Sequence, residues 1–223
     1  MHELRLEPLK SASSVPPNHP HVTHPMLIHA SSEWASNPNR ATLPPPGFGG
    51  LSRRHGKKPI IAAINGLCIG GGFEMAVNAD LIIASASAKF QLPEAQVGVA
   101  VLAGALPRLA RTVGKQRVTE LAITGRTLSA REAREWGLVN EVVERDTDLM
   151  PRAVEMAKRV VRCSPDSVII SREGIARGWE GSVVEGDAVT ERLWSAVEGT
   201  ANHEEGLRAW GKRKLPKWEP SKL

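Results

Sequence analysis

The sequence predicts an α/β fold in which short buried strands alternate with helices and a run of helices closes the chain. Two apolar runs rich in β-branched residues, "PIIAAI" at 59–64 and "LIIAS" at 81–85, are typical of buried strands. From about residue 150 onward, one helical segment follows another. This order predicts an α/β core over residues 59–147 and a helical region over 148–223.

Turn and cap residues place the individual elements. Asn65-Gly66 ends the first strand, and "FEMAVNAD" after the glycines predicts a helix. Glycines close the helical segments "ALPRLARTVG" and "KQRVTELAITG" in the manner of C-caps. Ser129 and Glu132 form a capping box that opens a short helix ending at Gly137. Further helix breaks are expected at "CSPD" and near Gly178. Strands are predicted at 59–64, 81–85, 88–91 and 138–143.

Composition excludes several classes of protein. The chain has 223 residues, a formal net charge of +5 and two cysteines, Cys68 and Cys163. No stretch is long and apolar enough to cross a membrane, and the N-terminus lacks the apolar block of a signal peptide. Both cysteines lie in apolar sequence, and two such residues suit neither a disulfide framework nor a zinc site. We therefore expect reduced thiols in an intracellular protein.

Residues 1–58 have the composition of irregular chain. They hold nine of the sixteen prolines and six of the seven histidines. His19, His21 and His24 are close enough in sequence to consider a metal site. No carboxylate or cysteine cluster accompanies them, so a flexible tail is the favoured interpretation and no metal is predicted.

Three consecutive glycines, Gly70, Gly71 and Gly72, stand just before Glu74 between a strand and a helix. Glycine in a regular element costs about 0.5–1 kcal/mol relative to alanine, so such a run needs a reason. The loop lacks the Lys-Ser/Thr of a phosphate loop and the spacing of a dinucleotide-binding loop. One hypothesis is that amides at the helix N-terminus hold a developing oxyanion. The alternative is that the glycines only allow strand and helix to pack closely.

A second carboxylate follows in "QLPEAQVG", where Glu94 stands after a proline at a predicted strand end. In a compact strand–helix–strand arrangement, Glu74 and Glu94 both lie close to the glycine loop. Two carboxylates beside one site can divide acid and base roles. A glutamate in the first turn of a helix, such as Glu74, can also serve only to stabilise the positive end of the helix dipole. Spacing alone does not decide between a catalytic and a stabilising role.

These motifs resemble the enoyl-CoA hydratase/isomerase (crotonase) family. The similar segments are "PIIAAINGLCIGGGFEMAVNADLIIAS", "AKFQLPEAQVGV", the helices through "TGRTLSAREAREWGLVNEVV" and the closing "EEGLRAWGKRKLPKW". The resemblance runs from about Pro59 to Trp218. It implies a spiral core of ββα units, C-terminal helices that mediate oligomerisation as a trimer or hexamer, and no cofactor.

The resemblance also assigns roles to single residues. Gly71 corresponds to an oxyanion-hole donor, flanked in the substrate site by Gly70 and Gly72. Glu74 corresponds to the carboxylate that activates water, and Glu94 to the one that exchanges a proton with the carbon next to the thioester. The presence of both glutamates favours hydration of a trans-2-enoyl-CoA, in β-oxidation or a secondary-metabolite pathway, over isomerisation.

One part of the family pattern is missing upstream. The family has a further oxyanion-hole donor in a segment of the type F-x-A-G-A-D-L, and "MLIHASSEW" stands near its place. We therefore expect that this chain lacks the opening strands and that first donor. Loss of one donor lowers a rate by about 10²–10³-fold.

The C-terminal segment adds two expectations. Ser221-Lys222-Leu223 is a terminal S-K-L, the signal that the peroxisomal import receptor reads. Trp210 and Lys212 stand in a basic stretch that holds CoA in the family, since an indole can stack on adenine and a cation suits phosphate. A solvated basic helix packed through its tryptophans explains the same stretch.

A function of another class is a non-catalytic relative that binds nucleic acid or a protein. The basic net charge is compatible with it. No basic stripe dominates the core and both glutamates are retained, which argues against nucleic acid.

Overall fold

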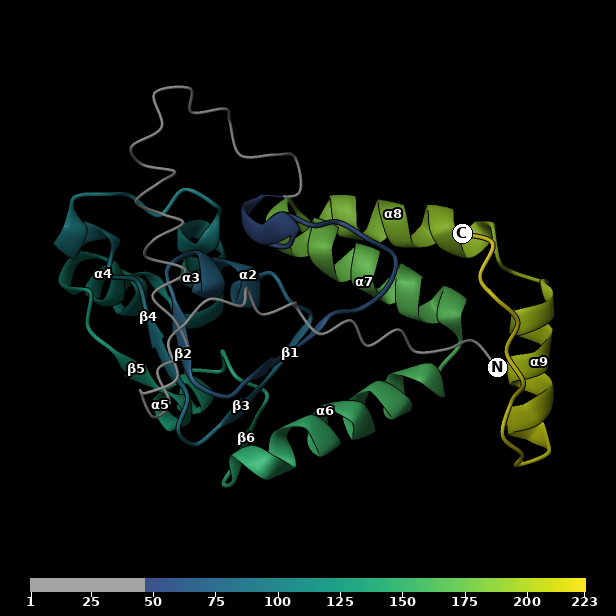
Figure 1. The fold of residues 1–223 in the computed structure, drawn as a ribbon. Helices are drawn as coiled ribbons and strands as arrows, with labels where there is room; N and C mark the ends of the chain where they lie inside the picture. The colour runs from purple at the N-terminus through teal and green to yellow at the C-terminus, as the bar shows by residue number, and fades with distance from the viewer. Residues whose placement is uncertain (1–46) are drawn as a thin grey trace.

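The computed structural model describes residues 47–223 and places an α/β core at one end and a set of long helices at the other (Figure 1). Residues 1–46, including His19, His21 and His24, lie outside the described residues. In chain order the elements are η1 (Phe48–Gly50), β1 (Ile61–Ile64), β2 (Leu67–Ile69), α2 (Gly71–Val77), β3 (Leu81–Ser85), β4 (Lys89–Gln91), η2 (Glu94–Val97), α3 (Ala105–Val113), α4 (Lys115–Thr124), β5 (Leu128–Ser129), α5 (Ala130–Glu135), β6 (Glu141–Val143), α6 (Asp146–Val161), α7 (Pro165–Glu180), α8 (Val183–Ser195) and α9 (Ala201–Gly211).

Two small sheets form the strand layer of the core. In the first, β3 lies between β1 and β6 and is parallel to both, with Ile61 opposite Leu81 and Ile83 opposite Glu141. In the second, β4 is parallel to β2 and antiparallel to β5. The pairing of β1 with β3 confirms that the two predicted apolar strands are neighbours.

The core lies where α2, α3 and α4 cover these sheets. Phe73 of α2 and Phe90 of β4 are fully buried, and their ring centroids are 5.3 Å apart. Leu109, Leu121 and Leu128 fill the space around them. The buried side of each helix therefore follows from the apolar spacing of its sequence.

The caps mostly follow the sequence. Gly114 and Gly125 end α3 and α4, and the Ser129 side chain accepts a hydrogen bond from the Glu132 amide at the start of α5. The Glu132 side chain instead pairs with Arg126 at 2.7 Å. Two short strands, β2 and β5, were not predicted, because three and two residues show no readable alternation. The break predicted near Gly178 is present slightly further along the chain: α7 continues to Glu180, and α8 begins at Val183.

α7 and α8 form an antiparallel pair that extends away from the core (Figure 1). Glycines allow the two helices to approach closely. A Cβ built on Gly186 of α8 would lie 2.9 Å from both the carbonyl oxygen of Gly174 and the Cα of Gly178. A Cβ on Gly178 would meet nothing nearer than 3.8 Å. Gly186 is thus the position at which a side chain would force the backbones apart.

The chain end folds back along α9. The Asn202 side chain accepts from the Glu219 amide at 2.9 Å and donates to the Glu219 carbonyl at 3.1 Å. The Trp218 indole donates to the carbonyl of Arg162 at 2.8 Å. These bonds join the C-terminal tail to the end of α6 and to α9.

The other structural expectations can be compared directly. Within residues 47–223 no helix is long and apolar enough to cross a membrane. Both cysteines are free thiols; Cys68 is buried, and burial raises its pKa to about 12. The expectation of apolar surroundings is wrong for Cys163, which is exposed at the end of α6.

The glycine contact between α7 and α8 generates a stability prediction. We expect Gly186→Ala to lower the free energy of unfolding by roughly 1–3 kcal/mol relative to Gly178→Ala, since only the former places a methyl group against backbone. Both substitutions bring the same gain in helix propensity, so their difference isolates the steric term. Urea unfolding followed by circular dichroism measures it. Equal stability of the two variants would show that the helices separate without cost.

Candidate active site

The glycine loop makes a sharp turn between β2 and α2. Gly70 has φ +54° and ψ −124°, a conformation that disfavours any residue with a Cβ. Its amide donates to the Gln91 carbonyl at 3.0 Å, and its carbonyl accepts from the Glu74 amide at 2.9 Å. The turn is therefore fixed at both ends, against β4 and by the first hydrogen bond of α2.

Gly71 begins α2 and carries an amide available for a ligand. Among residues 47–223, its N–H has no hydrogen-bond acceptor, as expected for the first residue of a helix. The Phe48 ring packs directly over its Cα: a Cβ on Gly71 would lie 2.5–2.7 Å from three ring carbons. The turn of η1 therefore covers one side of this amide.

Glu74 is buried in the first turn of α2. Its side chain is 5% exposed, and Oε2 accepts a hydrogen bond from the Ala105 amide at 3.1 Å. Burial raises the pKa of this carboxyl, and the nearby Glu94 carboxylate raises it further. The amides of Ala105 and Ala103 oppose the shift. The carboxyl is thus held in place but remains easier to protonate than one in water.

Glu94 approaches the same turn from η2, just after β4. Its Oε1 lies 3.0 Å from the point that a Cβ on Gly70 would occupy, so the missing side chain makes room for the carboxyl. Its Oε2 is buried and has no hydrogen-bond partner within residues 47–223. Burial raises the pKa of Glu94, against the effect of its own backbone amide.

This arrangement suits proton transfer at a polarised carbonyl. Two glutamates with raised pKa values lie beside one turn, and one carboxyl oxygen lacks a partner. A buried polar atom without a partner is uncommon in proteins, and a catalytic role is one explanation for it. The Gly71 amide adds a hydrogen-bond donor for negative charge that develops on an oxygen.

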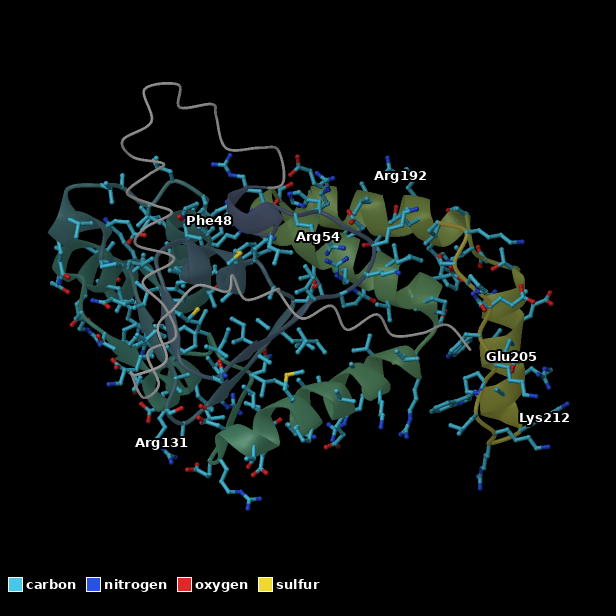
Figure 2. All side chains as sticks on the ribbon, viewed as in Figure 1. Phe48, Arg54, Arg131, Arg192, Glu205 and Lys212 are labelled. Carbon is cyan, nitrogen blue, oxygen red and sulfur yellow. The ribbon has the colours of Figure 1, made fainter. Side chains whose placement is uncertain are left out.

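The structure brings together some of the predicted site residues and not others. Gly70, Gly71, Gly72, Glu74 and Glu94 lie at one turn, as predicted. Two others lie elsewhere in the chain. Trp210 is 86% exposed on α9, and Lys212 lies at the opposite end of the molecule from Phe48 (Figure 2).

Sequence reasoning missed two contributors. Phe48 lies in the segment assigned to irregular chain, although its glycines in "PGFGG" are a turn signal. Ala105 acts only through its backbone, which no side-chain pattern reveals.

A cavity lies away from Glu74 and Glu94, on the side of the core that faces α7. It measures about 720 Å³, separates α7 from the core, and is lined by residues that include Asn78, Arg108 and Trp179. Neither Glu74 nor Glu94 lines it. Its volume therefore says nothing about the proton-transfer site.

The chain matches one protein family and several of its known members. The profile of the enoyl-CoA hydratase/isomerase family matches residues 51–221. A mevalonyl-coenzyme A hydratase of Aspergillus fumigatus is 49% identical over 80% of this chain and 66% of its own length. One from Beauveria bassiana is 47% identical over 79% of this chain and 64% of its own. The chain thus spans just under two thirds of these relatives.

A solved structure agrees with the sequence matches. The crystal structure of an enoyl-CoA hydratase from Mycobacterium tuberculosis superposes with a TM-score of 0.77 at 29% identity. The match covers 86% of this chain and 75% of that one. It confirms the predicted fold class, including the spiral core of ββα units.

The raised pKa values of Glu74 and Glu94 generate a prediction about pH and stability. Because folding raises both pKa values above 4.5, the folded chain holds protons that the unfolded chain releases. The free energy of unfolding therefore falls as pH rises from 4.5 through the raised values. We expect Glu74→Gln and Glu94→Gln to weaken this fall and to stabilise the chain at pH 7 by on the order of 1 kcal/mol.

Urea unfolding at several pH values provides the measurement. Glu198→Gln is the matched control, since Glu198 is exposed and the same change there removes no buried charge. Destabilisation by both buried substitutions at pH 7, with the pH dependence unchanged, would contradict the raised pKa values.

Proposed function

Because this chain belongs to the enoyl-CoA hydratase/isomerase family, we propose that it catalyses reversible addition of water to a 2-enoyl-CoA thioester. The observation that carries the proposal is the pairing of buried Glu74, in the first turn of α2, with half-buried Glu94, which approaches the same turn from η2. Their pKa values are raised by burial, and they face a turn that offers a free amide. Neither a tight strand–helix contact nor a helix dipole requires a second carboxyl beside Glu74 with one oxygen buried and unpartnered within residues 47–223.

The proposed chemistry uses the two carboxyls in opposite roles. Glu74, as a carboxylate, takes a proton from water as the water oxygen bonds to C3. The electrons of the C2–C3 double bond move onto the thioester oxygen, and Glu94 as a carboxylic acid then donates its proton to C2. Burial raises the pKa of both carboxyls, so the division of the two roles rests on the family resemblance and not on the pKa values.

The Gly71 amide is the proposed donor to the thioester oxygen. Charge develops on that oxygen only as water adds, so a fixed donor lowers the barrier more than it strengthens substrate binding. One such donor contributes about 2.7–4 kcal/mol.

For the substrate we propose a 3-hydroxyacyl-CoA related to mevalonyl-CoA, with its dehydrated enoyl form as the reaction partner. Identity of 49% and 47% to two mevalonyl-coenzyme A hydratases supports this choice over a straight-chain substrate. The runner-up is isomerisation of an enoyl-CoA, which needs only one carboxyl for proton transfer. The buried position of Glu74 favours hydration.

The two roles can be separated by substitution. In the purified chain, Glu74→Gln and Glu94→Gln should each lower hydration of a 2-enoyl-CoA by roughly 10²–10⁴-fold, because glutamine keeps the size and removes the acid–base function. Exchange of the C2 proton of a saturated acyl-CoA in deuterated water should be lost in Glu94→Gln and largely kept in Glu74→Gln. Mass spectrometry of the thioester measures that exchange.

Glu198→Gln serves again as the control and should leave both rates unchanged. If a CoA ester binds but both glutamate variants match the parent chain in every assay, the glutamates are structural and the hydratase proposal is wrong. Isomerisation that survives in Glu74→Gln, without any hydration in the parent chain, would favour the runner-up.

Assembly as a homotrimer or hexamer is proposed from family membership. Apolar side chains on the outer helices support it: Ile175, Val183 and Val184 are 71%, 72% and 76% exposed. In an assembly, α9 of one chain can approach the site of another. That is how the exposed Trp210 and Lys212 would contribute to CoA binding.

We also propose that the chain is imported into peroxisomes through Ser221-Lys222-Leu223. Lys222 is exposed, while Ser221 and Leu223 are half-buried. The Leu223 amide donates to the Ser221 hydroxyl at 3.1 Å, and the Lys57 ammonium donates to the Leu223 carbonyl. These exposed or partly exposed contacts are weak enough for a receptor to replace.

A fluorescent fusion that leaves this C-terminus free should collect in peroxisomes. Deletion of residues 221–223 should release it into the cytosol, because the receptor reads the terminal tripeptide. Fluorescence microscopy with a peroxisomal marker measures the overlap. Punctate import that persists after the deletion would place the signal elsewhere.

A further inference from the structure

We propose that a pocket formed by the segment after η1, the start of α3 and the end of α7 binds the phosphate group of a phosphate monoester. The pocket has a volume of about 390 Å³. It adjoins the cavity of about 720 Å³, with which it shares Arg108 and Trp179. Neither Glu74 nor Glu94 lines it, so the proposal does not depend on the hydratase chemistry.

Three arginines line this pocket. Arg53 follows η1, and Arg108 and Arg111 lie three residues apart on α3, a spacing that puts both on one side of that helix. Glu180, at the end of α7, is the only acidic side chain in the lining. With His55 counted as neutral, three guanidinium groups against one carboxylate leave a formal charge of +2. The lining therefore favours an anion.

Two of these arginines are accessible and lack a carboxylate partner. Arg53 and Arg111 are exposed. Arg53 donates to the Leu102 carbonyl at 2.7 Å, and Arg111 donates to the Trp179 carbonyl. Among residues 47–223 neither of them forms an ion pair, whereas Arg108 does. Because a guanidinium has five N–H donors, most donors of Arg53 and Arg111 remain available to a ligand.

The alternative is that these arginines only hold α7 against α3. Arg108 does serve that purpose, since it donates to the Glu180 carboxylate at 3.0 Å. The bond from Arg111 to the Trp179 carbonyl also meets the negative end of α7, which amounts to about half a charge. Arg53, however, bonds to neither Glu180 nor α7. A helix clamp therefore leaves the third guanidinium, and the excess positive charge, without an explanation.

Charge and size define the ligand class. A phosphate monoester carries about −1.5 to −2 charges at pH 7, which matches the excess charge of the lining. Guanidinium groups bind its oxygens in pairs. At about 30 Å³ for each atom, 390 Å³ holds roughly 13 non-hydrogen atoms, enough for the phosphate and one ring. Pro107 and Trp179 supply apolar lining for that ring.

Titration of the whole chain with phenyl phosphate, followed through the tryptophan indole N–H signals by NMR, tests the proposal. We expect a saturable shift of the Trp179 signal and none of the Trp136 and Trp194 signals, which are outside the pocket. Phenyl sulfate has the same shape and one negative charge fewer, so it should bind at least fivefold more weakly. Equal affinity for the two compounds, or a shift that does not saturate, would overturn the proposal.

Charge variants test which groups hold the phosphate. Arg53→Gln and Arg111→Gln should each weaken binding of phenyl phosphate about tenfold, because each removes charged donors. Arg192→Gln is the control, since Arg192 is exposed on α8 and outside the pocket (Figure 2). Glu180→Gln frees Arg108 and should strengthen binding severalfold, a gain that a misfolded chain cannot produce. Unchanged affinity in both Arg53→Gln and Arg111→Gln, or weaker binding in Glu180→Gln, would contradict the proposal.

Competition identifies the source of the phosphate. If CoA displaces phenyl phosphate and dephospho-CoA does not, the ligand is the 3′-phosphate of CoA. If inorganic phosphate displaces it and neither CoA compound does, the pocket serves a separate phosphorylated compound. Both results support a phosphate site, whereas no displacement by any of the three competitors would exclude one.

Discussion

The site depends on one steric constraint: the start of α2 must lie against β4 with nothing between them. Gly70 satisfies it by adopting a positive φ and by donating to Gln91 of that strand. The space left by its missing side chain is occupied by the Glu94 carboxyl. The same turn starts α2 and so positions Glu74. A side chain at Gly70 would therefore disturb the backbone and the carboxyl together.

This constraint places charge where charge is costly. The pKa of Glu74 is raised although the Ala105 and Ala103 amides act on its carboxyl, and Glu94 Oε2 has no partner within residues 47–223, so the chain does not fully replace the hydration that the two carboxyls lose. A sequence selected for stability alone would place apolar groups there. Acid–base work near neutral pH needs a carboxyl that is easily protonated, and the raised pKa values meet that need. Stability is thus reduced at the positions proposed to do the chemistry.

The sequence predicted those parts of the structure that local patterns control. The apolar strands β1 and β3, the glycine caps of α3 and α4, and the proximity of Glu74 and Glu94 all follow from local spacing and order. Contacts made by backbone atoms or by distant segments could not be predicted in this way. The Ala105 amide on Glu74 and the Phe48 ring on Gly71 come from elements 31 and 23 residues away, and neither has a motif of its own.

The helical region packs differently from the core and leaves more apolar surface exposed. α7 and α8 pack through glycines, α9 binds the tail through Asn202, and many apolar side chains remain exposed. Such a region gains little from its own burial and is suited to contact with other surfaces. The core holds the proposed chemistry in one turn, whereas the helices carry the predicted assembly surface, the basic stretch and the proposed C-terminal signal. Glu74 and Lys212 lie far apart within one chain, and the proposed assembly is the arrangement in which both could serve one CoA thioester.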